Sequence, residues 1–441
     1  MSTSNHDGRP MNTGSRIPGF YRLPPEARRA ALLERTPLEA ADLPDLDASS
    51  LGIERAGIMV ENVVGTLALP LGVAVNLQIN GQDVLVPMAV EEPSVVAAVS
   101  NMARLVRKAG GFQASADDGI MLGQVQITDC LDIDAAVATL EAETETLCAL
   151  GDTCHPRLLA RGGGMRGATV RRLTYDEPGE PAEEMLVFQF RLDCVDAMGA
   201  NMVNTVAERL APRIEDLVEG NVRLRILSNL ASERLAHASC AIPVALLASA
   251  DAPGSGPEVA EGIASAYRFA WADPWRAATH NKGVLNGIDA VAVATGNDWR
   301  AIEAGAHAWA ARSGQYRSLT TWKVNNGVLY GNIDVPMQVG TVGGPIANHP
   351  GVRANLKMLG NPRARELAQL IAAVGLAQNL GALRALATEG IQRGHMRMHA
   401  RNIAIQAGAD ASEVRDVVQA MCGERDWSEA RARQALAELR A

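Results

Sequence analysis

The sequence is poor in the features that mark several common classes of protein. Only 4% of its 441 residues are aromatic, so its core is expected to consist mainly of Leu, Val, Ile, Met and Ala. It has no excess of basic residues, and its formal net charge of −9 argues against nucleic acid or an anionic membrane as the main partner. No apolar run approaches the roughly 18–20 residues that a membrane-spanning helix needs.

The cysteines and the first residues of the chain bear on its compartment. Six cysteines are scattered along the sequence without a CxxC pair, which indicates reduced thiols and neither a disulfide framework nor a zinc site. Residues 1–10 contain no apolar stretch of the kind that a secretory signal peptide has. We therefore expect a cytoplasmic protein that binds no metal.

The N-terminal part is predicted to contain a β-hairpin followed by a helix. A chain of 441 residues is long enough for two or three domains. Asn80-Gly81 separates two β-rich segments, and both residues tolerate the positive φ that a tight hairpin turn needs. Pro93 then starts a helix that runs to Lys108, where two glycines stop it.

Residues 119–228 are predicted to form a separate α+β unit. Strands are expected at 123–128, 168–175, 185–194 and 221–228, with helices at 131–150 and 196–210. This βαββαβ order within about 110 residues is typical of a ferredoxin-like fold. Helices dominate afterwards, at 258–271, 299–312, 364–389, 395–407 and 428–439. The fold class is therefore α+β, with a helical large domain that the ferredoxin-like unit interrupts.

The stretch from 280 to 300 combines charged residues with an apolar run. Residues 290–294 (AVAVA) have the length and β-branched content of a buried strand. Asp298 is placed to cap a helix that begins at Trp299. On this interpretation, Lys282 and Asp298 lie at opposite ends of one rigid element, which is a way to fix a charged pair in a site.

Two glycine-containing segments are candidates for nucleotide binding. Residues 162–167 (GGGMRG) match GxGxxG, but they follow a helical pattern and precede a strand. This order is the reverse of a Rossmann phosphate loop, so a plain loop is favoured. Residues 196–201 (DAMGAN) open a helix with small residues that would let a pyrophosphate approach the free amides. From spacing alone, an ordinary capped helix is the favoured interpretation of this second segment.

Taken one at a time, the charged candidates have ordinary explanations. Glu92 before a proline-started helix is typical of a carboxylate that complements a helix dipole. Lys282 alone is typical of a surface lysine, and Asp298 alone of an N-cap. His395 and His399 share a helical face, but no HExxH sequence or cysteine partner accompanies them, which argues against a metal site.

Nine blocks of the sequence, taken together, carry a resemblance to a known family. They are ENVVG at 61–65, PMAVEEPS at 87–94, DAMGAN at 196–201, RLRILSNL at 223–230, DPWRAATHNK at 273–282, ATGNDWR at 294–300, GTVGG at 340–344, GLAQNLG at 375–381 and GHM at 394–396. They cover most of residues 55–405 in order. The set resembles the soluble class II form of 3-hydroxy-3-methylglutaryl-coenzyme A (HMG-CoA) reductase.

The resemblance implies an enzyme with four catalytic residues. This family interconverts HMG-CoA and mevalonate plus coenzyme A, using two hydrides from a nicotinamide cofactor. Lys282 matches the lysine that stabilises the oxyanion, Glu92 the glutamate that passes a proton, and Asp298 the aspartate that links the two. His395 matches the histidine that protonates the departing coenzyme A thiolate.

The resemblance also implies contacts with substrate and cofactor. Arg276 would pair with the free carboxylate of the substrate, which suits the fork of a guanidinium group. The other implied substrate-binding residues are Glu61, Asn62, Ser94, Asn286, Gln378 and Asn379. The implied cofactor motif is Asp196, Met198, Gly199, Ala200 and Asn201.

The choice of nicotinamide cofactor is expected to depend on the end of the first helix of the inserted unit. In NAD-preferring relatives an acidic residue there holds the adenosine ribose, whereas His155 falls at that position here, with Asp152 nearby. A carboxylate would repel a 2′-phosphate, while His155 and Arg157 would attract one. NAD(H) receives a mild preference because the remaining motifs resemble those of degradative relatives, and NADP(H) is the alternative.

The resemblance implies three domains and a homodimer. The large substrate-binding domain would comprise 1–118 and 229–388, the cofactor domain 119–228, and a C-terminal flap 389–441 that closes over substrate. The family's active site lies between subunits, so a homodimer or a larger assembly of dimers is expected. Mevalonate catabolism is the favoured direction and NADPH-dependent biosynthesis the alternative. A different NAD(P)-dependent hydroxy-acid dehydrogenase is the main competing function.

Overall fold

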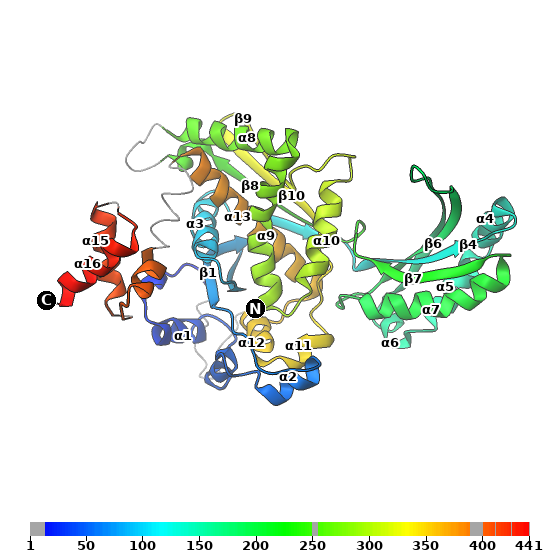
Figure 1. Cartoon of the computed structure of the whole chain (residues 1–441), viewed down its shortest axis with the longest axis horizontal. Helices are drawn as coiled ribbons and strands as arrows, with labels where there is room; N and C mark the ends of the chain where they lie inside the picture. The colour runs from blue at the N-terminus through cyan, green and yellow to red at the C-terminus, as the bar shows by residue number, and fades with distance from the viewer. Residues whose placement is uncertain (1–13, 249–254, 389–399, 411, 425, 441) are drawn as a thin grey trace.

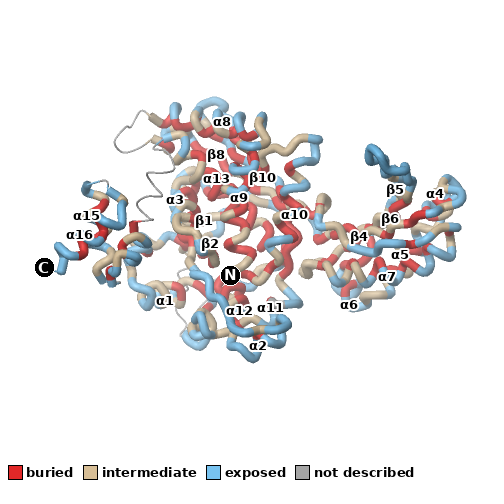
Figure 2. The backbone as a smooth tube through the Cα atoms, viewed as in Figure 1, coloured by how far each residue is buried: buried red, intermediate tan, exposed pale blue. Residues whose placement is uncertain are grey.

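The computed structural model describes residues 14–248, 255–388, 400–410, 412–424 and 426–440 of the chain. Three bodies follow one another along the long axis of the molecule (Figure 1). A central body of helices and sheets lies between a sheet-and-helix unit at one end and the C-terminal helices at the other. Each body has buried residues of its own inside it (Figure 2).

A four-stranded antiparallel sheet and a hairpin form the β-structure of the central body. The sheet, in the order β3-β8-β10-β9, consists of β3 (Gln113–Ala116), β8 (Leu235–Pro243), β10 (Val328–Pro336) and β9 (Thr320–Asn325). The hairpin consists of β1 (Leu71–Ile79) and β2 (Gln82–Ala89). Asn80 and Gly81 at its turn have φ values of 50° and 79°, so the hairpin predicted from these two residues is confirmed.

Long helices cover this sheet and carry most of the apolar core. They are α3 (Val95–Lys108), α8 (Gly256–Ala272), α9 (Pro274–Ala294), α10 (Trp299–Ala310) and α13 (Ala364–Ala387). By length and composition α13 could cross a membrane, but 67% of its most apolar window is buried inside the structure. The expectation that no segment is this long and apolar is therefore wrong. A helix packed against α3, α8, α9 and the sheet is apolar on most of its faces.

One helix, α9, replaces a predicted strand. Residues 290–294 form the last turn of α9, so the predicted strand is wrong. The alanines at alternate positions favour a helix there. Because the run is buried on nearly every side, it lacks the apolar–polar periodicity that distinguishes a helix from a strand. The predicted cap of α10 by Asp298 is confirmed, because its carboxylate accepts hydrogen bonds from the amides of Arg300 and Ala301.

The unit that interrupts the central body has the predicted ferredoxin-like arrangement. Its antiparallel strands, in the order β5-β6-β4-β7, are β5 (Gly164–Tyr175), β6 (Glu183–Asp193), β4 (Ile120–Thr128) and β7 (Asn221–Ser228). Its helices are α4 (Ile133–Ala142), α5 (Thr144–Asp152), α6 (Pro156–Leu159) and α7 (Ala200–Leu217). Residues 162–167 lead into β5 and no helix follows them, which excludes a Rossmann phosphate loop.

Most of the remaining elements are shorter, and residues 400–406 of the predicted helix at 395–407 are helical. The shorter elements are α1 (Pro25–Leu33), α2 (Ile53–Met59), α11 (Gly344–Asn348) and α12 (Pro350–Met358), with 3-10 turns at Phe20–Arg22, Ala40–Leu46 and Val244–Leu247. The C-terminal helices α15 (Val414–Glu424) and α16 (Glu429–Arg440) pack around an apolar cluster of their own. All six cysteines are free. Residues 389–399 of the predicted flap, which include His395 and His399, lie outside the described residues.

Candidate active site

A lysine–glutamate pair joins two distant segments of the central body. Glu92 lies between β2 and α3, and Lys282 lies on α9. Lys282 Nζ donates to Glu92 Oε2 at 2.6 Å, and Asn286 Nδ2, one helical turn further on, lies 3.4 Å from the same oxygen. The side chains of Lys282 and Glu92 are 61% and 32% exposed, so a ligand can reach the pair. Three residues named from the resemblance are thus close together within one chain.

Asp298 does not join this pair within one chain. Its carboxylate caps α10 and lies 3.1 Å from the Arg300 guanidinium. Lys282 lies 294 − 282 = 12 residues before the end of α9. At a rise of 1.5 Å per residue, Lys282 is about 18 Å along the helix axis from that end, beyond which Asp298 lies. The expected link between Asp298 and Lys282 is therefore not made by these two residues of a single chain.

A buried polar network holds the segment of α9 that carries Lys282. His280 Nε2 lies 2.7 Å from Thr320 Oγ1 and 3.2 Å from Asn379 Nδ2. Asn379 Oδ1 accepts a hydrogen bond from Trp322 Nε1 at 2.8 Å. Burial, with a smaller contribution from Arg276, lowers the pKa of His280 to about 3, so its imidazole is neutral. Asn379, expected to bind substrate, is 1% exposed and uses its amide inside this network.

The other residues expected to contact substrate lie in different settings. Gln378 is 7% exposed, and its buried Oε1 has no hydrogen-bond partner in the described chain. Arg276 is half-buried in the first turn of α9, and burial lowers the pKa of its guanidinium. Ser94 precedes α3 with a φ of 79°. Glu61 and Asn62 belong to the exposed segment between α2 and β1.

A large cavity opens beside Glu92. It has a volume of about 1200 Å³, and both Glu92 and Ser94 line it. Five arginines line the same cavity: Arg16, Arg28, Arg29, Arg104 and Arg401. Such a lining fits a ligand with several phosphate groups, because guanidinium groups bind phosphate by charge and by paired hydrogen bonds. These arginines are not evident from the sequence because they come from four separate segments, and the adjacent pair at 28–29 is the one local signal.

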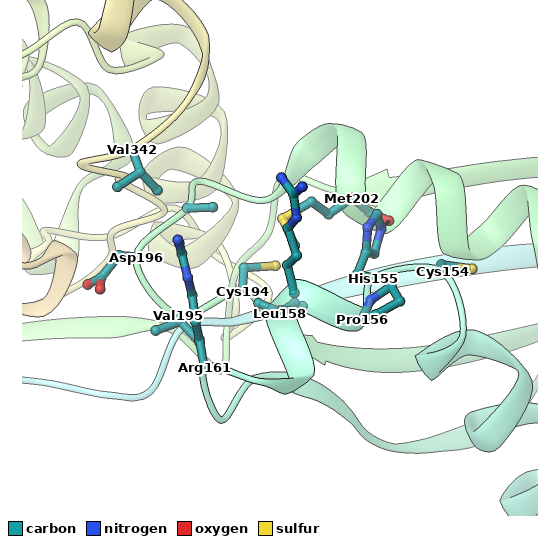
Figure 3. A pocket seen from close by; sticks show the side chains of 12 residues that line it. Cys154, His155, Pro156, Leu158, Arg161, Cys194, Val195, Asp196, Met202 and Val342 are labelled. Atoms are coloured by element: carbon teal, nitrogen blue, oxygen red, sulfur yellow. Dashed lines mark hydrogen bonds between the residues drawn. The ribbon is translucent and has the colours of Figure 1, made fainter.

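A second pocket lies where the inserted unit meets the central body. It has a volume of about 620 Å³, with His155, Asp196 and Met202 on the inserted unit and Val342 on the body (Figure 3). The rest of the expected cofactor motif, 198–201, forms the adjoining loop and the start of α7. α7 begins without a side-chain cap, which leaves its first amides able to bind an anion.

The lining of this second pocket is positively charged. Among the described residues that line it, Arg157 and Arg161 are basic and Asp196 is the single acidic residue. The Asp196 carboxylate accepts a hydrogen bond from the amide of Ala364 at 3.0 Å and lies 3.5 Å from the Arg363 guanidinium. Two arginines beside an uncapped helix terminus fit a phosphate-bearing dinucleotide.

The cavity beside Glu92, the second pocket and the Lys282–Glu92 pair together fit an enzyme that binds a dinucleotide cofactor and an anionic substrate. Residues 24–400 match the family profile of hydroxymethylglutaryl-coenzyme A reductase. The chain is 48% identical over 408 residues to 3-hydroxy-3-methylglutaryl-coenzyme A reductase of Archaeoglobus fulgidus, covering 92% of this chain and 91% of that protein. It is 35% identical over 347 residues to a probable reductase of Borreliella burgdorferi, covering 78% and 77%.

Solved structures agree with these relatives. The 3-hydroxy-3-methylglutaryl-coenzyme A reductase from Streptococcus pneumoniae matches with a TM-score of 0.80 at 41% identity, covering 96% of this chain and 99% of that one. The class II enzyme of that organism bound to NADPH in open conformations matches with a TM-score of 0.77 at 41% identity, covering 94% and 98%. The protein is therefore a nicotinamide-dependent oxidoreductase. It belongs to the hydroxymethylglutaryl-coenzyme A reductase family, as its sequence motifs predicted.

Proposed function

We propose that the protein interconverts HMG-CoA and mevalonate plus coenzyme A at the Glu92–Lys282 pair, with two nicotinamide equivalents in each turnover. The observation that carries this proposal is the 2.6 Å contact between Lys282 and Glu92 at the edge of an arginine-lined cavity. Membership of the family supports the reaction itself. The proposal adds which residues perform it, which cofactor is preferred and how the subunits are arranged.

The Lys282 ammonium group stabilises the negative charge that develops on the substrate carbonyl oxygen. An exposed cation at hydrogen-bond distance is suited to this task because it is already in place before the charge appears. Glu92, held by Lys282 and Asn286, passes a proton to the same oxygen at the aldehyde stage. The bound cofactor supplies the hydride. His395 protonates the coenzyme A thiolate, a role that rests on its match to the family motif.

Coenzyme A is proposed to occupy the cavity beside Glu92. Its phosphate groups pair with some of the five arginines that line this cavity. The unpaired Gln378 Oε1 accepts a hydrogen bond from substrate, and the partly desolvated Arg276 binds the substrate carboxylate. Glu61, Asn62 and Ser94 remain proposed substrate contacts. Asn379 is proposed to act by holding α9 through His280.

NADP(H) is proposed as the preferred cofactor, in place of the mild preference for NAD(H) drawn from the sequence. Arg157 and Arg161 line the pocket, whereas its one acidic residue is already bonded to the start of α13. Guanidinium groups attract a 2′-phosphate, and two arginines outnumber the one carboxylate among the described lining residues. The NADPH complex of the related streptococcal enzyme supports this choice. It favours the reductive direction over mevalonate catabolism.

A homodimer is proposed to complete the active site. The segment from α2 to β1 exposes apolar side chains to an unusual degree: Ile58 by 85%, Val64 by 96% and Leu67 by 94%. Such a patch marks a protein interface, and a symmetric dimer buries the same patch of both subunits. The second subunit then supplies the Asp298 that α9 holds away from Lys282. The domain limits 1–118 with 229–388, 119–228 and 389–441 are retained as proposals.

Stoichiometry tests the reaction. With excess reduced cofactor, the wild-type protein is expected to oxidise two cofactor molecules for each mevalonate formed from HMG-CoA. Mevalonate oxidation in the reverse direction is expected to require coenzyme A. A ratio of one, or oxidation that proceeds without coenzyme A, would identify a simple hydroxy-acid dehydrogenase and overturn the proposal.

Substitution of the two pocket arginines tests the cofactor preference. Arg157→Ala combined with Arg161→Ala is expected to raise the KM for NADPH about tenfold, the loss typical of charged hydrogen bonds to phosphate, with little change in the KM for NADH. Arg213→Ala is the control, because Arg213 pairs with Glu143 on the same unit and does not line the pocket. Equal changes for both cofactors would contradict recognition of the 2′-phosphate.

A further inference from the structure

One buried arginine contacts the inserted unit and the central body at the same time. Arg234 lies just before β8, where the chain returns to the body, and is 5% exposed. Its guanidinium donates to Ala197 O at 3.1 and 3.2 Å and to Met198 O at 3.0 Å. It also donates to Val339 O at 2.6 Å. A single side chain therefore binds one carbonyl of the central body and two carbonyls of the loop at 196–199 before α7, which we call the cofactor loop.

Burial of the Arg234 guanidinium is unfavourable in itself. No carboxylate of the described chain forms an ion pair with Arg234, and burial lowers the pKa of its guanidinium. A buried cation without a direct ion pair costs free energy, and the nearby carboxylates of Asp193 and Asp196 offset only part of the effect of burial. The guanidinium group fixes the relative positions of these segments, because its planar fork of donors reaches several acceptors that a single ammonium group cannot bridge.

The segments that Arg234 joins form two adjoining walls of the cofactor pocket. Asp196 and Ala197 line the pocket on the inserted unit, and Val342 lines it on the body. The walls are also in direct contact, since the amide of Thr341 donates to Asp196 O at 2.9 Å. A Cβ at Gly340 would lie only 2.5 Å from the backbone nitrogen of Met198, so a larger residue would push the two segments apart.

We propose that Arg234 is a positioning residue that holds two adjoining walls of the cofactor pocket together. It touches neither substrate nor cofactor. By holding Ala197 and Met198 against Val339, it sets where the uncapped start of α7 presents its amides. This inference rests on the proposed function only in taking the pocket of about 620 Å³ as the cofactor site.

Direct cofactor binding tests the proposal. The fluorescence of reduced cofactor, titrated without substrate, gives a Kd for wild type, Arg234→Met and Arg234→Lys. Arg234→Met keeps the length of the side chain and removes its donors, so the Kd is expected to rise about tenfold or more. Arg234→Lys keeps the charge and is expected to recover part of the loss. The KM for HMG-CoA is expected to stay within about twofold, since that substrate lies against other elements.

A neighbouring ion pair provides the control. Arg191→Met breaks the contact of 2.8 Å with Glu233, the residue before Arg234, without touching the cofactor loop. Its Kd for the cofactor is expected to match wild type. Wild-type cofactor binding by a folded Arg234→Met variant would overturn the proposal. An equal rise in the KM for HMG-CoA would also overturn it, because that result indicates general loss of packing.

A second variant covers the case in which Arg234→Met does not fold. Gly340→Ala keeps the arginine but forces the same two walls apart, so it is expected to weaken cofactor binding with the KM for HMG-CoA nearly unchanged. Unaltered cofactor binding by Gly340→Ala would overturn the proposal. Failure of wild type itself to bind either reduced cofactor would overturn the pocket assignment as well, which separates the two ideas.

Discussion

Mixed dimers of two inactive variants test where Asp298 acts. Lys282 lies twelve residues before the end of α9 and Asp298 lies beyond that end. The separation of about 18 Å along the helix is far more than a hydrogen bond spans. If Asp298 acts on the lysine pair at all, it does so from the other subunit. Each dimer then has two sites, and each site combines Lys282 of one chain with Asp298 of its partner.

The assay compares homodimers with purified heterodimers. Lys282→Ala and Asp298→Asn homodimers are each expected to lose about 10²–10³ in kcat, as removal of a group that stabilises an oxyanion does. Co-expression of the two variants with different affinity tags allows the heterodimer to be isolated. One of its sites carries both defects and the other carries neither, so about half of the wild-type activity per dimer is expected.

A second heterodimer distinguishes complementation between subunits from residual activity of the variants themselves. Glu92 and Lys282 contact each other within one chain at 2.6 Å, so each site of a Glu92→Gln/Lys282→Ala heterodimer carries one defect. That pair is expected to remain as inactive as its parents. The reasoning is refuted if the Asp298→Asn/Lys282→Ala heterodimer is equally inactive, because Asp298 and Lys282 would then belong to one subunit.

Three further predictions concern the interface, a buried acid and the histidine. Val64→Asp with Leu67→Asp should convert the proposed dimer to a monomer in analytical ultracentrifugation, whereas Leu131→Asp, at an 84% exposed site on the inserted unit, should leave that dimer intact. Burial, with Glu303 adding to it, raises the pKa of Asp289 from 3.8 to about 8. Between these two pKa values the folded protein keeps Asp289 protonated while the unfolded chain releases the proton, so the free energy of unfolding falls as pH rises from 3.8 to about 8. Asp289→Asn should reduce the fall in Tm over this pH range, and an unchanged slope of Tm against pH would contradict the prediction. His395→Gln should slow thioester turnover more than reduction of free mevaldehyde, and equal losses in kcat would exclude thiolate protonation.

Much of the fold follows from local sequence chemistry. The Asn80-Gly81 pair strongly favours a tight hairpin turn. That turn sets the register of the hairpin, whose second strand ends near Glu92. The order of strands and helices in 119–228 identifies the ferredoxin-like unit, whereas helix ends differ from the prediction: residues 131–150 form α4 and most of α5, and α7 runs to Leu217. Asp298 as a helix cap is also a local signal, since the capped amides are two and three residues away.

Features that depend on burial or on contacts between distant segments are not evident from the sequence. The run 290–294 is apolar on every face inside a packed helix, so its sequence does not reveal whether its period is two or 3.6. Asn379 matches a family motif, but only the fold shows that Thr320 and Trp322 use its amide. The arginines of the large cavity lie between positions 16 and 401, and no spacing rule connects them.

The hydrogen bonds around Asn297 explain why one chain would hold two separate half-sites. Asn297 Oδ1 accepts from the Gly340 amide at 2.7 Å, and Gly340 follows the Val339 carbonyl that Arg234 binds. The neighbouring Asp298 is therefore tied to the cofactor pocket of its own chain. Glu92 instead lines the arginine-lined cavity, and its partner Lys282 lies further back along α9. A monomer would then bind cofactor and coenzyme A at separate places, and only the dimer would bring Asp298 and the cofactor of one subunit to the lysine of the other.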